Sequence, residues 1–351
     1  MNSLERFYAT VERKPVDRPA SWLGMPSPGA LEGLFRHYQV DNMPALKEKI
    51  GDDLYAVEVP YQSECASAIY AAFDWYRDGA VDAVDRTLTA PGYFSDAGDP
   101  AEVENFDWPD PARYIDREEC LRRVREAPAG KTVVGMAWSA HFQDTCAAFG
   151  MEQALMHMIA EPELYQAVDD KVMEFYLKAN EIFYEAVKGR LHGVLIGNDM
   201  GSQRGLMVSP ELLRRFVIPG CRKLVEQAHA YGLKVIYHSC GAIADIIPDL
   251  IDAGVDVVHP IQALARGMQP ESLRQRFEGK ISFCGGVDTQ ELLVRGSGQE
   301  IRDKVRELAE IFPTGLILSP SHEALQPDVP ASNVEAMFDE IRKLKHHSFR
   351  I

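Results

Sequence analysis

The chain has 351 residues, with 53 acidic and 37 basic side chains and a net charge of −16. Its 46% hydrophobic and 26% charged residues are typical of a folded globular protein and exclude a disordered or fibrous chain. The Lys and Arg residues are scattered and form no basic stripe, so the sequence predicts no nucleic-acid partner.

The first 20 residues carry charges every few positions, and no stretch of the chain approaches the roughly 20 apolar residues that cross a membrane. We therefore expect a cytoplasmic protein without a membrane partner. Cysteines are few and far apart, which predicts reduced thiols and not a disulfide framework. They are Cys65, Cys120, Cys146, Cys221, Cys240 and Cys284.

Short apolar runs rich in β-branched residues recur along the chain, and most precede a helical pattern. The predicted strands are residues 20–24, 54–59, 132–137, 192–197, 233–238, 255–260, 281–285 and 315–319. Eight parallel strands that alternate with helices predict a (β/α)8 TIM barrel, with residues 1–351 as a single domain. The alternative is an open doubly wound sheet, which usually has fewer strands and often a glycine-rich first turn that this chain lacks.

Helices are predicted where apolar residues recur at spacings of three and four, at 209–231, 297–311 and 330–345. Residues 144–189 are expected to form two or three further helices, separated at Gly150 and Pro162.

Residues 60–131 interrupt this alternation. The segment is rich in Gly, Pro and Asp, and only its end, near 117–127, has a helical period. We interpret it as an irregular insertion after the second strand that flanks or caps the barrel mouth.

Polar, titratable and sulfur-containing side chains follow most of the predicted strands. In chain order they are Trp22 and Met25, Glu58, Trp138, Ser139 and His141, Asn198, Asp199 and Gln203, His238 and Cys240, His259 and Gln262, Cys284 and Asp288, and His322 and Glu323. Because the carboxyl ends of barrel strands carry the chemistry in this fold, these residues predict a metal site or an acid/base site at one end of the barrel.

The stretch "VIYHSCGAIADIIPDL" gives the sharpest motif, because it ends an apolar strand with His238 and Cys240. Residues two apart in an extended backbone point to the same side, and Gly241 permits a sharp turn afterwards. Imidazole nitrogen and thiolate sulfur suit zinc, whose catalytic sites usually have three protein ligands and one open position. The competing interpretation is a hydrogen-bonded histidine beside an inert buried cysteine.

A third zinc ligand must come from another strand. We expect His322, in "SPSHEALQPD", while Cys284, Glu58 and Asp199 remain alternatives. Without a metal, His322 is expected to bind substrate through hydrogen bonds.

The remaining candidates have both a functional and a structural interpretation. Asp199 either contacts a ligand or caps the next helix, and Gln262 and Asp288 either contact substrate or satisfy backbone groups. Trp22, Met25 and Trp138 are expected to line the pocket or the core.

Four segments together resemble the uroporphyrinogen decarboxylase superfamily. They are "GNDMGSQRGLMVSPELLRRFVIPGCRKL", "GLKVIYHSCGAIADIIPDLIDAGVDVVHPIQ", "ISFCGGVDTQELL" and "LSPSHEALQPDVPASNVEAM", and "EPELYQAVDDKVMEFYLKANEIF" agrees with the preceding helices. The resemblance covers roughly residues 190 to 340 and implies a (β/α)8 barrel.

Two branches of that superfamily imply different chemistry. True uroporphyrinogen decarboxylases need no cofactor and hold a tetrapyrrole with N-terminal arginines, whereas the corresponding stretch here, "RPASWLGMPSPGALEGL", lacks those basic residues. Corrinoid-dependent methyltransferases bind zinc through a His-x-Cys pair, which His238 and Cys240 match, and a late cysteine. This chain has His322 in the region of the late cysteine.

The resemblance therefore implies a zinc-dependent methyltransferase. It would move a methyl group between a corrinoid, either methylcobalamin or a partner corrinoid protein, and a small thiol or methylated small molecule. Asp199 and Gln203 would orient the substrate, with Asn198 beside them, and Glu58 would supply or accept a proton.

The alternatives are a metal-free decarboxylase or lyase that acts on a small carboxylic acid, with His238, His322 and Asp199 as acid/base residues, and a corrinoid-binding protein without turnover. The sequence leaves open the direction of transfer and whether the chain forms a homodimer.

Overall fold

The computed structural model describes residues 1–62 and 91–344, and within them eight parallel strands form one sheet. The strands are β1 (Ala20–Ser21), β2 (Leu54–Glu58), β3 (Thr132–Trp138), β4 (Gly193–Gly197), β5 (Lys234–His238), β6 (Val257–Ile261), β7 (Ser282–Val287) and β8 (Leu316–Pro320). Their order is β1-β8-β7-β6-β5-β4-β3-β2, so the first and last strands of the chain pair with each other. The predicted (β/α)8 barrel is confirmed, and the doubly wound alternative is excluded.

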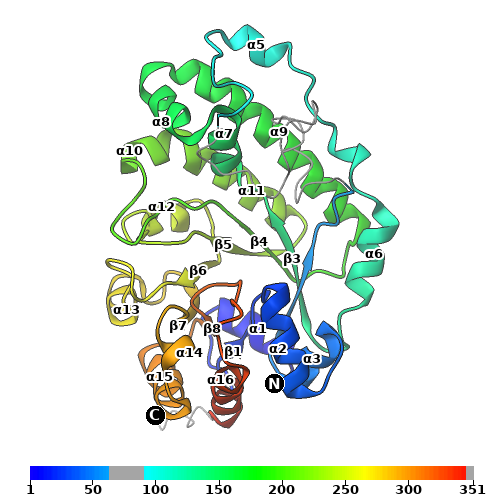
Figure 1. Ribbon diagram of the computed structural model, residues 1–351, viewed down its shortest axis with the longest axis vertical. Coiled ribbons are helices and arrows are strands. Elements are labelled where there is room, and N and C mark those ends of the chain that lie inside the picture. Colours follow the sequence, from blue (N-terminus) through cyan, green and yellow to red (C-terminus); the bar gives the residue numbers. More distant parts are fainter. Residues whose placement is uncertain (63–90, 345–351) are drawn as a thin grey trace.

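Helices follow the strands and cover the outside of the barrel (Figure 1). The helices before and within the first half are α1 (Ser3–Val11), α2 (Pro28–Tyr38), α3 (Met43–Ile50), α5 (Pro100–Glu104), the 3-10 turn η3 (Pro111–Arg113), α6 (Arg117–Arg125), α7 (His141–Phe149), α8 (Met151–Ala160) and α9 (Pro162–Ala186). Those of the second half are α10 (Pro210–Leu212), the π turn η4 (Leu213–Val217), α11 (Ile218–Ala230), α12 (Ile247–Asp252), α13 (Pro270–Phe277), α14 (Leu292–Arg295), α15 (Gly298–Ile311) and α16 (Ala331–Lys343).

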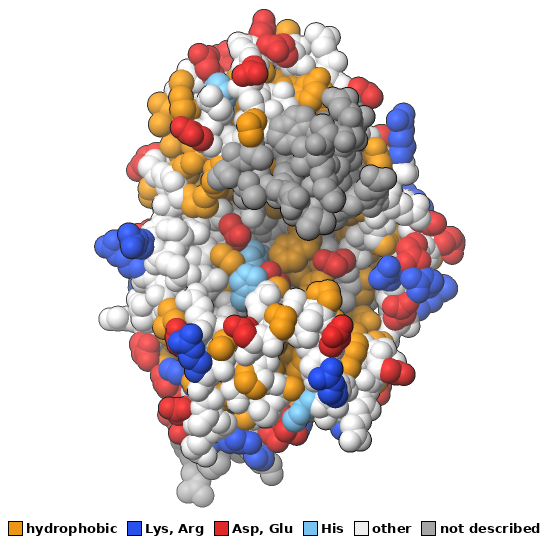
Figure 2. Space-filling view, in the orientation of Figure 1, with side chains coloured by type: hydrophobic (Ala, Val, Ile, Leu, Met, Phe, Trp, Pro, Cys, Tyr) orange, Lys and Arg blue, Asp and Glu red, His pale blue; other side chains and the backbone are white. Residues whose placement is uncertain are grey.

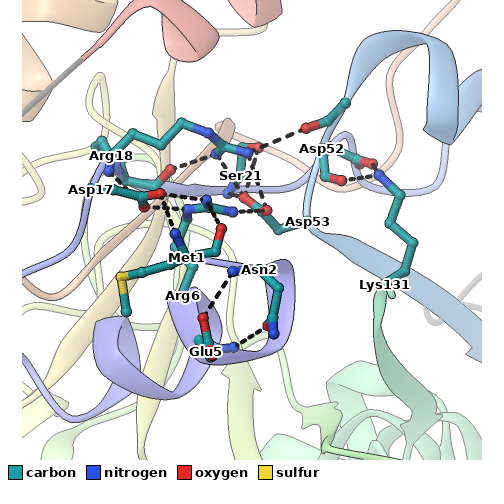
Figure 3. A network of polar contacts seen from close by, with 12 residues as sticks. Met1, Asn2, Glu5, Arg6, Asp17, Arg18, Ser21, Asp52, Asp53 and Lys131 are labelled. Atoms are coloured by element: carbon teal, nitrogen blue, oxygen red, sulfur yellow. Dashed lines mark hydrogen bonds and ion pairs between the residues drawn. The ribbon is translucent and has the colours of Figure 1, made fainter. Parts of the chain in front are cut away.

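The barrel closes between β1 and β2 through buried charges and not through a long ladder of backbone pairs. The Asp53 N–H donates to the Ser21 carbonyl at 2.9 Å, and the Asp53 carboxylate accepts from the Ser21 N–H at 2.9 Å. Arg6 of α1 and Arg18 place their guanidinium groups on the same carboxylate at 2.6 and 2.8 Å (Figure 3). Because Asp53 is fully buried, its charge depends on these partners.

Two layers of apolar side chains hold the barrel together. Inside it, Phe7, Trp22, Met136, Ile236 and Cys284 belong to one buried cluster. Outside it, a larger cluster fills the space between strands and helices. The side chains inside the barrel make a packed floor beneath the strand ends.

Most predicted elements are confirmed within a few residues, with two instructive differences. The first strand ends at Ser21 and not at residue 24, because Gly24 has a φ of +83° and turns the chain against the backbone of Glu323. The helix predicted at 209–231 is continuous but contains the π turn η4 just before Pro219, whose missing N–H removes one helical hydrogen bond.

The predicted insertion falls partly outside the described residues, because residues 63–90 belong to the part that is not described. Its described end contains α5, η3 and α6, and α6 agrees with the helix expected near 117–127. The single-domain boundaries and the capping role of 60–131 stay predictions. Within residues 1–62 and 91–344, no helix combines the length and apolar character needed to cross a membrane.

Candidate metal centre

Two neighbouring strand ends bring His238, Cys240 and Asp199 together. His238 is the last residue of β5, Cys240 lies two residues beyond it, and Asp199 lies two residues beyond β4. Their ligand atoms all lie within 4.8 Å of one another. The predicted His238–Cys240 pair thus faces one point, as the alternation of an extended backbone requires.

The distances among these donors fit a tetrahedral metal ion. His238 Nε2 lies 3.5 Å from Cys240 Sγ and 3.2 Å from Asp199 Oδ1. Zinc bond lengths of about 2.3 Å to sulfur and about 2.05 Å to nitrogen or oxygen give tetrahedral separations of about 3.5 Å for N···S and about 3.3 Å for N···O. The donor set therefore fits zinc with three protein ligands and one open position.

The Asp199 carboxylate is held in place by neighbours from two other elements. Its Oδ1 accepts the Cys240 N–H at 2.8 Å. Gln143 of α7 clamps the same residue twice: its Oε1 accepts the Asp199 N–H at 2.9 Å, and its Nε2 donates to Oδ2 at 3.4 Å. Gln143 was not among the predicted site residues, because its position on the first turn of a helix gives no signal in the sequence.

The other ring nitrogen of His238 has its own partners. Nδ1 lies 3.0 Å from His259 Nδ1 and 3.4 Å from Glu323 Oε2. If Nε2 ligates a metal, Nδ1 carries the hydrogen and donates it to this pair, which resembles the carboxylate–histidine arrangement behind many zinc ligands.

The electrostatics of the donor set favour the forms that bind metals at sulfur and oxygen. Burial opposes ionisation of Asp199, but the hydrogen bond and charge of His238 outweigh it and lower the pKa to about 2. Burial also opposes ionisation of Cys240, yet hydrogen bonds from His238 and His322 lower the pKa of its thiol. Burial lowers the pKa of His238, but hydrogen bonds with Asp199 and Cys240 outweigh it, so the pKa of this imidazole is raised.

His322 lies at the edge of the donor set and not within it. Its ring centroid is 6.2 Å from that of His238, and its side chain is 35% exposed. Its Nδ1 accepts the Ala324 N–H at 3.0 Å, so in a neutral ring the other nitrogen carries the hydrogen and has no lone pair for a metal. A hydrogen bond to Cys240 raises the pKa of His322. The donors within 4.8 Å of one another thus include Asp199 and not His322, and His322 as the third ligand stays a prediction.

The other two alternatives for that position lie apart from the donors. Cys284 is fully buried inside the barrel, and burial raises the pKa of its thiol. Glu58, the last residue of β2, is exposed and accepts a hydrogen bond from Trp138 Nε1 at 3.4 Å.

Aromatic side chains flank the donors. The Trp138 ring meets the His238 ring edge to face, with centroids 5.6 Å apart. A register shift in β3 and left-handed backbone at Trp138 and Ser139, with φ of 53° and 56°, aim this ring. Trp22 is buried against His259 at 5.2 Å, and Met25 is half-buried above the barrel interior.

The remaining predicted residues mainly support the backbone. Asn198 accepts the Phe142 N–H, Gln262 accepts the Gly241 N–H at 2.7 Å, and Asp288 accepts N–H groups at the start of α14. Gln203 is exposed on its loop. Their predicted contacts with substrate stay predictions.

A second buried network lies behind the strand ends. His141 Nδ1 is 2.8 Å from Asp169 Oδ1, and Cys221 Sγ is 2.6 Å from the Tyr237 hydroxyl. Burial opposes protonation of His141, but Asp169 raises its pKa to about 10. Both pairs are buried, so the network ties α7, α9 and α11 to β5.

The face in Figure 2 is hollowed at its centre. Hydrophobic, acidic and histidine side chains meet in the hollow, whereas the Lys and Arg side chains visible on this face lie around its periphery.

Comparisons with known proteins agree with this architecture. The family described as uroporphyrinogen decarboxylase (URO-D) matches residues 89–344. No curated protein sequence matches the chain. Among solved structures, a methyltransferase from Methanosarcina mazei has a TM-score of 0.69 at 17% identity, covering 98% of this chain and 99% of that one. A candidate vitamin-B12-independent methionine synthase from Listeria monocytogenes has a TM-score of 0.43 at 14% identity, covering 94% and 95%. At 17% identity, the likeness to the Methanosarcina mazei protein is one of fold.

Proposed function

Because the chain belongs to the uroporphyrinogen decarboxylase family, we propose a function that uses the strand ends of this family's barrel. The proposed activity is zinc-dependent methyl transfer between a corrinoid, either methylcobalamin or a corrinoid protein, and a small thiol or methylated small molecule. The observation that carries it is the convergence of His238 Nε2, Cys240 Sγ and Asp199 Oδ1 at tetrahedral spacing.

Three side chains would hold the zinc ion, namely His238, Cys240 and Asp199. When bound, zinc lowers the pKa of a coordinated thiol so that it is a thiolate at neutral pH. Gln143 and the Cys240 N–H fix the Asp199 carboxylate, while Glu323 and His259 fix the ring plane of His238.

In the direction towards a thiol, the thiol loses its proton on binding. A sulfur–carbon bond then forms with the methyl group as the cobalt–carbon bond breaks, and the electron pair of that bond stays on the corrinoid. For a substrate that carries no cationic group, we propose Glu58, which is exposed beside Trp138, as the residue that accepts or returns the proton. The corrinoid would approach from the barrel mouth, free or on a partner protein.

The first test is the zinc content of the purified protein, measured by plasma emission spectroscopy, together with demethylation of methylcobalamin in the presence of thiols. We expect about one zinc per chain. Cys240→Ser should abolish both zinc binding and turnover, whereas the matched change Cys284→Ser, at a buried thiol outside the donor set, should preserve the zinc.

The third ligand is tested in the same experiment. Asp199→Asn should lower zinc affinity at least tenfold, and His322→Gln should change it little, because Nδ1 of His322 is occupied by the Ala324 N–H. The reverse order would restore His322 as the ligand.

A metal-free decarboxylase or lyase remains the second candidate because His238 is fully partnered without a metal. Its two nitrogens face Asp199 and Glu323, which is an acid/base arrangement in itself. This function would be favoured if the purified protein contains no zinc and does not demethylate methylcobalamin, but releases carbon dioxide from a small carboxylic acid. A homodimer and a cytoplasmic location stay predictions.

A further inference from the structure

In the described part of the chain, the strand ends around the candidate metal centre carry acidic side chains that form no ion pair with Lys or Arg. Glu58, Asp199 and Glu323 come from three different strand ends. Among residues 1–62 and 91–344, their ion pairs join them to histidines, and no Lys or Arg forms an ion pair with any of the three. On the face in Figure 2, the visible Lys and Arg side chains lie around the hollow and not in its centre.

Two of these carboxylates already have proposed roles in the candidate metal centre. Asp199 is one of the three donors, and Glu323 lies 3.4 Å from His238 Nδ1, with its Oε2 buried and without a hydrogen-bond partner. Glu58 is different, because it is exposed and its one described partner is the Trp138 indole N–H at 3.4 Å. Its charge is therefore available to a ligand.

Trp138 connects Glu58 to the metal centre. One part of its ring donates to Glu58, and the same ring packs edge to face against His238 at 5.6 Å. The backbone of Trp138 has a φ of 53°, a conformation that L residues rarely adopt and that places this ring at the strand end. An aromatic face beside a carboxylate is the environment that organic cations prefer.

We propose that the substrate at this site carries a positively charged nitrogen, held against the Trp138 ring and paired with Glu58. The inference rests on the proposed function and names its substrate class: for transfer to a thiol, the acceptor is a small aminothiol. Its sulfur would occupy the open position at zinc and form the bond to the methyl group as the cobalt–carbon bond breaks, with that electron pair left on the corrinoid. The thiol proton would pass to water, because Glu58 stays ionised beside the ammonium group, which keeps its proton throughout.

An anionic acceptor would be repelled by the same acidic side chains. With zinc bound, its two positive charges would balance Asp199 and Cys240, so the carboxylates left to repel an anionic acceptor are Glu323 and Glu58, and this repulsion is strengthened where water is partly excluded. Arg204 and Arg266 lie on the loops after β4 and β6, but both are exposed and neither pairs with the acidic set in the described part of the chain.

Three thiols with the same two-carbon skeleton test the charge preference: 2-aminoethanethiol (positive), 2-mercaptoethanol (neutral) and 2-mercaptoethanesulfonate (negative). Binding to the zinc-loaded full chain is measured by isothermal titration calorimetry, and demethylation of methylcobalamin is measured separately by absorbance. We expect the positive thiol to bind about tenfold tighter than the negative one.

The variants remove the influence of intrinsic thiol reactivity, because each is compared with the wild type for the same thiol. Glu58→Gln and Trp138→Leu should each reduce the preference for the positive over the neutral thiol by about fivefold. Glu48→Gln removes the same charge from an exposed position on α3 and should leave the preference unchanged.

The two proposals fail in different ways. If the negative thiol binds as tightly as the positive one, if Glu58→Gln leaves the preference intact, or if no thiol binds, the cationic substrate is wrong, whether or not methyl transfer occurs. If the positive thiol binds best and none of the three is methylated, the substrate class stands and the methyltransferase function falls.

Discussion

At the scale of single residues, the two nitrogens of His238 face opposite environments. Nε2 points to the soft and anionic donors Cys240 and Asp199, while Nδ1 points to His259 and Glu323. Burial, His238 and His322 all lower the pKa of His259, which favours the neutral ring that could accept a hydrogen from His238. This division lets one buried side chain act as a metal ligand while its orientation is set from behind.

Gln143 is the residue whose change should expose this positioning. Gln143→Met keeps the size of the side chain but removes both hydrogen bonds to Asp199, so zinc affinity should fall about tenfold to a hundredfold. Competition with a zinc-sensitive dye measures the affinity. Gln166→Met, which breaks only an exposed contact to Asp170 on α9, is the matched control. Equal affinities of the two variants would show that Gln143 does not orient the ligand.

At the scale of elements, the candidate metal centre depends on a close approach between the backbones of the loops after β4 and β5. A Cβ on Gly241 would lie 2.5 Å from the carbonyl carbon of Gly201, and Gly241 has a φ of +85°. The loops after β4 and β5 can therefore touch only because both residues are glycine. The same contact brings Asp199 beside the Cys240 N–H at 2.8 Å.

The contact between β1 and β2, where the barrel closes, depends on Asp53. Asp53→Asn removes the carboxylate that balances Arg6 and Arg18 in a buried place, so the variant should lose about 3 kcal/mol of unfolding free energy. Urea denaturation followed by circular dichroism measures the loss. Asp96→Asn, at an exposed position, should be nearly neutral. A loss below about 1 kcal/mol for Asp53→Asn, which is about the error of such assays, would mean that the contact does not depend on this charge.

At the scale of the whole molecule, which has a charge of −16, carboxylates in the described part of the chain meet arginines both within one helix turn and between distant segments. Asp17 is one example with a consequence for pH. A hydrogen bond from Arg6 is the main cause that lowers its pKa, against the effect of partial burial.

A carboxyl group whose pKa is lower in the folded than in the unfolded state stabilises the fold above its unfolded pKa of about 3.9, and the stabilisation disappears as the pH falls through the folded pKa. Asp17→Asn should therefore cost at most about 1 kcal/mol at pH 7, since the side chain is partly exposed and screened. The difference from the wild type should shrink as the pH falls below about 4. Urea denaturation at pH 7 and pH 3 checks this, and a difference that grows in acid would contradict it.

The sequence by itself determined the fold and part of the site. Eight apolar runs separated by helical periods sufficed for the barrel, because strand and helix periods are local properties of the chain. The spacing of His238 and Cys240 sufficed to place them on one side of a strand end, for the same reason.

Only the tertiary structure decided which residues from other strands join that pair. His322 has the better ligand chemistry in the sequence, but we propose Asp199 for the third place, because a backbone N–H two residues away occupies Nδ1 of His322 and two glycines let the loops after β4 and β5 touch. Gln143, and the pairing of Glu58 with Trp138, depend on contacts between residues 56 and 80 positions apart. Such contacts follow from how the strands and helices pack, which no local pattern in the sequence records.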